Sequence, residues 1–379
     1  MRRFTLEEST ELGVWTEHWI SPIIPEENDG SGFSAGGVGS RSAYFIRLLP
    51  IPWVFEPVMT SGDWLGDFQV AFDPQGALVL LFQNRTTNAL HVMEQEQPGI
   101  WSEPELVATT GVPDAPGGLD NNGYSGVEFF ILADGTRLIT CLDQYNGEVI
   151  CLEASPGGTG WTRHWIAGDF QVPAWVKATS AVSGDDQLAI AYGDPDGCFL
   201  YLAPVEEIGS GKTLFLSSES PINRPAIVFT GSNELLAYIR SGVRIDLETE
   251  DRTGINITGN LLPFSVTNGR LVSMQVGETS VVLFRSTDRG ATWNPEYTVL
   301  GDLDEALVRF DGDGRARFLT SWYGRLTAHN RGEAGAVQSV RIANGSDSIG
   351  SVFVYPNGQL GAVLLSKRGT AAVTLARQE

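Results

Sequence analysis

The chain has 379 residues, of which 42% are hydrophobic, so it carries enough apolar material for a substantial core. Its 46 acidic residues exceed its 25 basic residues and give a formal net charge of −21, which repels nucleic acid and anionic membranes. The opening MRRFTLEESTELG has no apolar segment of a secretory signal, no run of residues is long enough to cross a membrane, and three cysteines do not make a disulfide framework. We therefore expect synthesis in the cytoplasm without a signal peptide.

A repeated turn is the most informative feature of the chain. The 44 glycines, 19 prolines and 10 tryptophans favour many short strands joined by turns. Turns rich in Gly, Asn and Asp end at residues 76, 135, 186, 233, 269, 314 and 358. Most of the intervals between these positions are close to the roughly 40–50 residues of a four-stranded propeller blade.

Each of these turns leads into an apolar strand, at residues 77–83, 137–142, 187–192, 234–239, 270–275, 315–320 and 359–365. Near-continuous apolarity is typical of strands that are covered on both faces by neighbouring sheets. The seven units predict an all-β fold: a seven-bladed β-propeller of four-stranded antiparallel blades. Six or eight blades remain the alternatives.

The two ends of the chain are predicted to complete one blade. The last unit stops before a fourth strand, and Trp15-Thr16-Glu17-His18-Trp19-Ile20 echoes Trp161-Thr162-Arg163-His164-Trp165-Ile166, the fourth strand of another unit. We therefore expect residues 11–20 to supply the missing outer strand, which would protect the edge of the last sheet. Residues 21–62 are interpreted as an inserted loop or hairpin, with part of an eighth blade as the alternative. Residues 63–379 then hold the repeated blades of one domain spanning 1–379.

A motif near residue 290 carries a family resemblance. Ser286-Thr287-Asp288-Arg289-Gly290-Ala291-Thr292-Trp293 matches the Asp-box pattern S/T-x-D-x-G-x-T-W at every specified position. The chain therefore resembles the Asp-box, or BNR-repeat, sialidase-like propellers, a group that includes sialidases, related glycosidases and non-enzymatic assembly factors. The resemblance implies a hairpin at the blade periphery in which Ser286, Asp288, Gly290, Thr292 and Trp293 have structural roles.

Catalytic and metal-binding patterns are incomplete. The sialidase resemblance would require three arginines, a tyrosine nucleophile with a glutamate partner and an aspartic acid, and no such spacing stands out. We therefore assign no catalytic residue, and a sialidase-like glycoside hydrolase stays as the alternative. Residues 194–197 and 311–314 each place two aspartates before a glycine, a fragment of a calcium loop that lacks the remaining ligands. No cofactor or metal site is predicted, and calcium at either turn is the alternative.

The loops at one end of the blades combine aromatic and polar side chains. Aromatic rings beside Asp, Asn and Arg are typical of sugar recognition and of protein–protein contacts. The sequence therefore predicts a non-enzymatic recognition or scaffold module that binds a glycan or a protein partner, as in a tail fibre, spike or tip of a phage or phage-like particle. The predicted binding residues of this loop face are Trp64, Asp67, Asp120, Tyr124, Tyr145, Trp175, Arg240, Trp322 and Tyr323.

Overall fold

The structure is a computed structural model that divides the chain into two compact units. The first unit comprises residues 1–62, 302–311 and 315–379, and the second comprises residues 63–301 and 312–314. The residues that the structure describes are 4–11, 14–20, 45–50, 53–59, 68–84, 87–109, 123–158, 160–168, 170, 177–194, 197–218, 225–238, 242–255, 265–267, 270–276, 280–300, 305–310, 316–322, 325–331, 337–343, 347–366 and 372–378.

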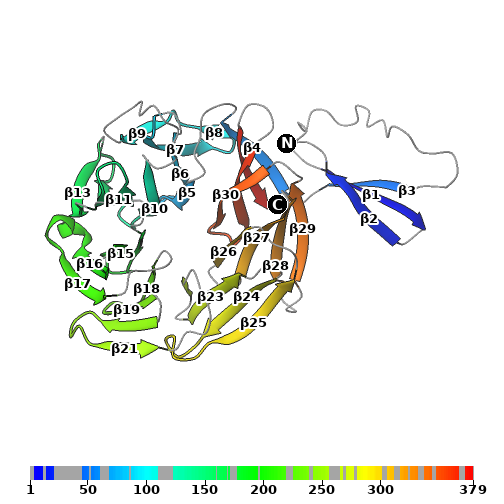
Figure 1. Ribbon diagram of the computed structural model, residues 1–379. Helices are drawn as coiled ribbons and strands as arrows, with labels where there is room; N and C mark the ends of the chain where they lie inside the picture. The colour runs from blue at the N-terminus through cyan, green and yellow to red at the C-terminus, as the bar shows by residue number, and fades with distance from the viewer. Residues whose placement is uncertain are drawn as a thin grey trace. The chain divides into compact units, whose positions relative to one another are not determined.

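The second unit consists of five antiparallel sheets, each made of strands that are consecutive in the sequence (Figure 1). The first sheet holds β5 (Gln69–Phe72), β6 (Leu78–Gln83), β7 (Leu90–Gln97), β8 (Ile100–Trp101) and β9 (Glu105–Ala108). The next two hold β10 (Tyr124–Ile131), β11 (Arg137–Asp143), β12 (Glu148–Ala154) and β13 (Thr162–Ala167), then β14 (Lys177–Val182), β15 (Gln187–Asp194), β16 (Gly197–Pro204) and β17 (Lys212–Ser217). The last two hold β18 (Ala226–Gly231), β19 (Glu234–Tyr238), β20 (Gly242–Asp246) and β21 (Arg252–Ile255), then β22 (Ser265–Thr267), β23 (Arg270–Val276), β24 (Ser280–Ser286) and β25 (Asn294–Leu300). A short 3₁₀ helix, η2 (Val205–Ser210), joins β16 to β17.

The first unit contains three sheets. One holds β26 (Glu305–Phe310), β27 (Ala316–Trp322), β28 (Arg325–Arg331) and β29 (Val337–Ala343). Another holds β30 (Asp347–Val354), β31 (Leu360–Ser366), β32 (Ala372–Gln378) and β4 (Trp53–Met59). The third is a small sheet of β1 (Phe4–Glu11), β2 (Val14–Ile20) and β3 (Phe45–Pro50), in the order β2-β1-β3.

These sheets establish an all-β fold, a β-propeller of four-stranded antiparallel blades. The prediction of seven four-stranded blades was wrong, because the described residues form six of them. The first repeat instead builds the five-stranded sheet β5–β9, in which β8 and β9 both pair with β7. Gly99, at a φ of +75°, turns the chain back into β8, and Pro104 before β9 has no backbone N–H to continue a ladder. The position of one outer strand is therefore divided between two short ones.

The strand that completes the last blade is not the predicted one. Residues 14–20 form β2, which pairs with β1 and not with β32, so residues 11–20 do not supply the outer strand. That place is taken by β4, whose Trp53 lies opposite Gln378 and whose Met59 lies opposite Val373. The segment 21–62, which was predicted to be an inserted loop or hairpin, therefore contains β3 and β4. Residues 21–44 lie outside the described residues.

Burial explains why β4 fits this position. Trp53 and Phe55 are almost fully buried and pack in one cluster with Leu360 and Ala362, whereas Pro57 on the same strand is exposed. An outer strand needs one buried face, and it tolerates a proline because its free edge requires no hydrogen bonds. The alternation of apolar and exposed residues in β4 satisfies both conditions.

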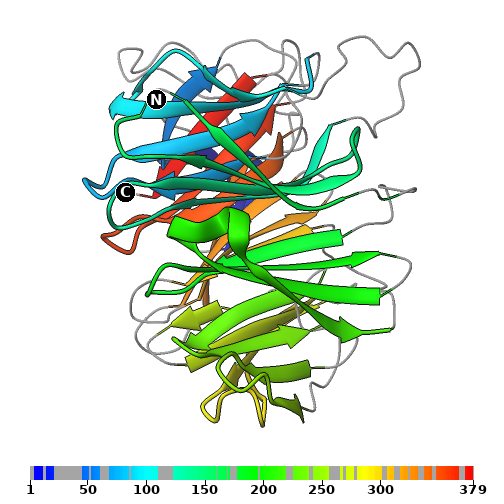
Figure 2. The same cartoon turned by 90° about the vertical axis from the view of Figure 1, so that its left-hand side faces the viewer.

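The cores of the second unit lie between successive sheets. Strands β6, β11 and β15 are buried almost throughout, as the apolar repeats predicted. One cluster joins Leu81 and Val92 to Ile139 and Ile150 of the next sheet, and equivalent clusters follow along the unit. Figure 2 shows the sheets β10–β13, β14–β17 and β18–β21 following one another, coloured from teal through green to yellow-green. The three cysteines, Cys141, Cys151 and Cys198, are free and buried.

A polar contact joins the inner strands of two adjacent sheets. The Glu128 carboxylate on β10 accepts hydrogen bonds from Thr179 Oγ1 at 2.8 Å and from both the backbone N and the Oγ of Ser180 at 2.9 Å. Gly126 allows this approach, since a side chain there would lie 3.2 Å from the Ala178 carbonyl oxygen and φ is +62°. Where the two sheets meet, their polar groups are therefore hydrogen-bonded to each other.

The motif at 286–293 forms the turn between β24 and β25. Asp288 Oδ1 accepts from Ser286 Oγ and from the Thr292 backbone N at 2.8 Å, and Oδ2 accepts from Thr292 Oγ1 at 2.6 Å. The Gly290 backbone N donates to Ser286 Oγ at 2.8 Å, and its φ of +86° suits glycine. Trp293 packs on the cluster of Leu236, Ile255 and Leu271 between two sheets.

The closure by β4 predicts a large loss of stability for Phe55→Ala. Removing a fully buried phenylalanine should lower the free energy of unfolding by about 3–5 kcal/mol. Pro57→Ala, at an exposed position of the same strand, is the matched control and should change it little. Urea denaturation followed by tryptophan fluorescence measures both, and equal effects would contradict the assigned strand.

The Asp288 turn predicts a stability change that depends on pH. Hydrogen bonds from the Thr292 side chain, the Thr292 backbone and Ser286 lower the pKa of Asp288 to about 2. The unfolded chain should titrate near ~3.9, so the stabilisation is complete above that pH and is lost as pH falls toward 2. We expect Asp288→Ala to lower Tm at pH 7 and the difference from wild type to shrink near pH 2. Asp288→Asn, which keeps one acceptor oxygen, should lie between them, and a difference independent of pH would contradict the account.

Candidate functional site

Two of the predicted loop-face residues have described side chains, and both belong to the sheet β10–β13. Tyr124 begins β10, and Tyr145 lies in the turn between β11 and β12. Trp322 is the last residue of β27. The remaining predicted residues, Trp64, Asp67, Asp120, Trp175, Arg240 and Tyr323, lie outside the described residues.

Tyr124 contributes to the core and not to the surface. Its side chain is 3% exposed and packs with Leu90 and Val127 between the first two sheets of the unit. Burial raises the pKa of its hydroxyl far above the ordinary value, and the neighbouring Cys141 and Asp143 add to the effect. Its backbone pairs with Asp143, so Tyr124 supports the strand end from which the turn to β12 begins.

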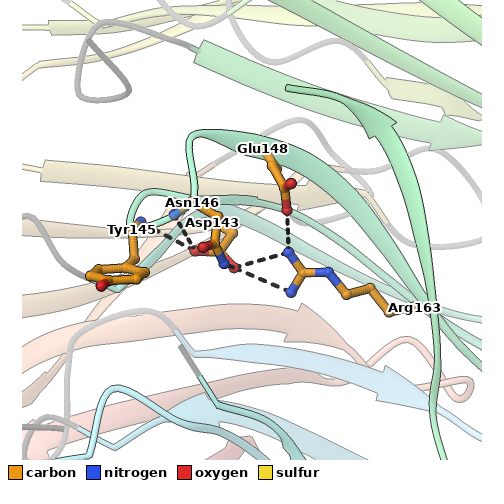
Figure 3. A network of polar contacts seen from close by, with 5 residues as sticks. All are labelled: Asp143, Tyr145, Asn146, Glu148 and Arg163. Atoms are coloured by element: carbon orange, nitrogen blue, oxygen red, sulfur yellow. Dashed lines mark hydrogen bonds and ion pairs between the residues drawn. The ribbon is translucent and has the colours of Figure 1, made fainter. Parts of the chain in front are cut away.

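A buried carboxylate organises that turn (Figure 3). Asp143 is 0% exposed, and its Oδ1 accepts from the backbone N atoms of Tyr145 and Asn146, each at 3.2 Å. Its Oδ2 accepts from Asn146 Nδ2 at 2.9 Å, and the Gly147 backbone N donates to the Asp143 carbonyl at 2.9 Å. Aspartate bonded to the backbone two and three residues ahead fixes a turn in one conformation.

An arginine on the outer strand neutralises this carboxylate. Arg163 of β13 donates to Asp143 Oδ2 from Nη1 at 3.2 Å and from Nη2 at 3.1 Å. Its Nη2 also lies 2.5 Å from Glu148 Oε2, so the guanidinium bridges two carboxylates, as Figure 3 shows. These bonds outweigh desolvation and raise the pKa of Arg163. Burying a carboxylate is costly unless it is paired and hydrogen-bonded, and Arg163 supplies that pairing for Asp143.

The result is an exposed aromatic ring on a rigid support. Tyr145 is 48% exposed, although its own backbone N and that of Asn146 donate to Asp143 Oδ1. Glu148 and Arg163 remain partly accessible beside it, with 28% and 37% of their side chains exposed. A ring to stack on, next to donor and acceptor groups, is the chemistry that binds sugar hydroxyls or a protein side chain.

The next sheet adds further aromatic side chains near this turn. The Phe170 backbone N donates to the Gly147 carbonyl at 3.3 Å, so the segment after β13 lies against the β11–β12 turn. The Phe170 ring contacts Tyr192, which stacks on Phe199 with centroids 5.5 Å apart, and Phe199 meets Phe215 edge-on at the same distance. Aromatic groups from two sheets therefore gather at this end of the unit.

Sequence reasoning did not find Asp143, Glu148 or Arg163. The available signal was an aspartate at a strand end followed by Asn146-Gly147, which is typical of a tight turn. Nothing local in the sequence indicates Arg163, because its contact with Asp143 depends on the register of two strands. Both partners become visible only when the sheet is assembled.

The described carboxylates at this site are not arranged for hydrolysis. A glycoside hydrolase needs one carboxylic acid and one carboxylate facing a substrate. Asp143 is buried, with its oxygens occupied by the turn and by Arg163, and Glu148 is bound to the same guanidinium. Within the described ranges, no group of three or more His, Cys, Asp or Glu residues is placed to hold a metal ion. None of the helices in those ranges has the length and apolar character of a membrane span. Asp311 and Asp313 lie outside those ranges, as does Asp196.

A groove among the described residues lies at the opposite ends of the strands. It has a volume of about 580 Å³ and runs along the turns of the sheets β14–β17 and β18–β21, where Asp185, Lys212 and Asn233 contribute to its walls. Lys212 is paired with Glu250 at 2.9 Å. This groove is separate from the Tyr145 turn, and none of the predicted loop-face residues lines it.

Comparison with known proteins identifies the fold and no family. No family model matches the chain, and no curated protein matches it. The structure is similar to that of prolyl endopeptidases with a TM-score of 0.52 and 13% identity, covering 87% of this chain and 50% of that one, so the chain spans about half the length of that relative. It is also similar to virginiamycin B lyase from Staphylococcus aureus (TM-score 0.51, 10% identity, 86% and 99% covered) and to the Dos1 propeller (TM-score 0.50, 10% identity, 86% and 96% covered). At these identities the likeness shows a β-propeller and nothing about activity.

The buried aspartate predicts a test of the turn. Asp143→Ala leaves Arg163 without its buried partner and frees two backbone N–H groups, so we expect the free energy of unfolding to fall by about 2–4 kcal/mol. Glu148→Ala removes only the more exposed half of the bridge and should cost less than about 1 kcal/mol. Urea denaturation compares the two variants, and a larger effect of Glu148→Ala would contradict this arrangement.

Proposed function

We propose that the protein is a non-enzymatic recognition module that binds a glycan or a protein partner through the end of the propeller that carries Tyr145. The proposal depends on one observation: an exposed tyrosine stands on a turn whose backbone is fixed by a buried, fully bonded aspartate. A side chain that is already ordered loses little conformational entropy on binding, which favours recognition by a fixed surface.

The groups around Tyr145 support binding more than turnover. Arg163 can donate hydrogen bonds to hydroxyl or carbonyl groups and Glu148 can accept them from hydroxyl or amide groups, and the two side chains form an ion pair with each other. The fully buried carboxylate of this turn, Asp143, holds the turn in place and cannot reach a substrate without opening it. The virginiamycin B lyase and the prolyl endopeptidases share the fold at 10% and 13% identity, which does not transfer their chemistry.

Removal of the tyrosine ring tests the proposal. We expect the wild-type protein to bind members of a glycan array, and Tyr145→Ala to weaken that binding at least about tenfold. Truncating an aromatic hot spot costs about 2 kcal/mol or more, and each ~1.4 kcal/mol corresponds to a tenfold change in affinity. Tyr145→Phe keeps the ring and should retain most of the affinity. Both variants should unfold at the wild-type temperature, because the side chain is half-exposed.

Two outcomes would contradict the proposal. Turnover of aryl glycosides, a sialoside included, would establish the alternative, a glycoside hydrolase. Glycan binding that is unchanged in Tyr145→Ala would move the site elsewhere. Absence of glycan binding, together with a protein ligand lost in Tyr145→Ala, would select the protein arm of the proposal.

The setting in a phage or phage-like particle is a further part of this proposal. A recognition module at a fibre, spike or tip would sediment with assembled particles and would be released with their tail components. Native particles are sedimented, and an antibody detects the chain in the particle and free-protein fractions. Recovery of the chain only as free protein would contradict the particle role.

A further inference from the structure

The outer strands of three successive sheets share one structural feature, close to the end of the blades that carries the Tyr145 turn. The outer strands β9, β13 and β17 pair with β7, β12 and β16. In each pair the register shifts once, because the outer strand carries one extra residue. The pairs before the shift are Leu90 with Ala108, Val149 with Ala167, and Cys198 with Ser217. The pairs after it are His91 with Leu106, Ile150 with Trp165, and Phe199 with Phe215. The same β-bulge therefore recurs at the same place in all three sheets.

The bulge sends two adjacent side chains in different directions. The extra residue of each strand, Val107, Ile166 or Leu216, packs into the apolar cluster between sheets. The residue before it is a large apolar side chain that stays in solvent: Leu106, Trp165 and Phe215 are 53%, 60% and 49% exposed. A single exposed apolar residue needs no explanation, but here large apolar residues are exposed at equivalent positions of three successive sheets. We call these three residues the outer apolar row.

Two members of the row are held rigid by their neighbours. The Trp165 indole lies over Gly168 and beside the Glu148 stem, where a side chain on Gly168 would come within 2.7 Å of Trp165 Nε1. Phe215 packs edge-on against Phe199, which in turn stacks on Tyr192. Rigid aromatic side chains that remain exposed are the usual anchors of protein–protein contacts.

The backbone at this place does not suit pairing with a foreign strand. A β-bulge interrupts the regular ladder and twists an edge, which is how natural sheets discourage edge-to-edge association. An occupant of the outer apolar row therefore contacts its side chains and does not extend the sheet.

Charge indicates which occupant fits the row. Glu96 and Glu103 are exposed on the β7–β9 segment and form no ion pair with any described residue. The adjacent bases are engaged: Arg163 with Asp143 and Glu148, and Arg137 with Glu94. With a net charge of −21 per chain, a second copy of the protein would be repelled. We propose that the outer apolar row docks a segment of a partner protein that carries apolar side chains flanked by lysine or arginine.

Synthetic peptides test this proposal on the full-length protein. The probes are arrayed peptides of three compositions: apolar residues with lysine and arginine, apolar residues with glutamate, and lysine and arginine with serine. We expect saturable binding only among the basic apolar peptides, measured for the best of them by fluorescence anisotropy. The double variant Trp165→Ala, Phe215→Ala should weaken it at least about tenfold. Ile100→Ala, an equally exposed apolar position outside the row at 51%, is the matched control and should leave it unchanged.

A second pair of variants probes the charge independently of the aromatic side chains. Glu96→Gln with Glu103→Gln should weaken binding of the same peptide at low salt and reduce the dependence of its affinity on ionic strength. Each variant is first compared with wild type by thermal unfolding. The Tyr145→Ala variant should bind the peptide normally, which separates this surface from the proposed loop-end site.

Several results would overturn the proposal. No saturable basic apolar peptide, equal binding of acidic apolar peptides, or the same loss in Ile100→Ala would each remove the row as a docking surface. Self-association that disappears in the Trp165→Ala, Phe215→Ala variant would show that the occupant is a second copy, against the charge argument.

Discussion

The structure depends on strands that are buried on both faces at once. Strands β6, β11 and β15 have no polar face toward solvent, so a single sheet of this kind cannot exist alone in water. Each becomes stable only when a neighbouring sheet covers it, which ties the sheets of a unit into one cooperative body. The polar contacts are placed where apolar contacts end: Glu128 with Ser180 at the inner strands, and Asp143 with Arg163 at a strand terminus. The apolar contacts hold the sheets together, and the polar ones set their alignment and the conformation of their turns.

The strands that are buried on both faces could be predicted from the sequence, because apolar composition and the spacing of the repeated turns are enough to identify them. A run such as ALVLLFQ after a Gly-rich turn permits one environment, and the structure has β6 there. Pairing between distant strands is harder, because it is decided by partners that sequence similarity does not reveal. Residues 15–20 resemble β13 but pair with β1, while β4, which shows no such resemblance, completes the last blade. The signal for β4 was Pro57 in an apolar run, which is compatible only with an edge strand or a bulge.

The candidate site shows the same division between local and assembled information. Tyr145 could be placed in an exposed turn because Asn146-Gly147 marks that turn locally. Tyr124, also aromatic and also at a strand end, is buried, and no local feature distinguishes the two residues. The difference arises from what faces them. The neighbouring sheet covers the first residue of β10, whereas the turn projects beyond the strands. Residues that project beyond a sheet can be predicted from turn chemistry, and those within it need the packing of the next sheet.

The outer strands have two requirements that compete. They must bury one face to hold the blade together, and their free edge must not attract another strand. A bulge serves both, because it keeps one side chain in the core while breaking the regular edge. Its geometric consequence is that the preceding residue turns outward, as Leu106, Trp165 and Phe215 do. Edge protection alone would be served as well by lysine or glutamate at these positions. Large apolar side chains reduce solubility at an exposed site and add nothing to the interrupted ladder, so edge protection does not account for their presence in three successive sheets. A contact with another molecule accounts for both the position and the chemistry of these residues.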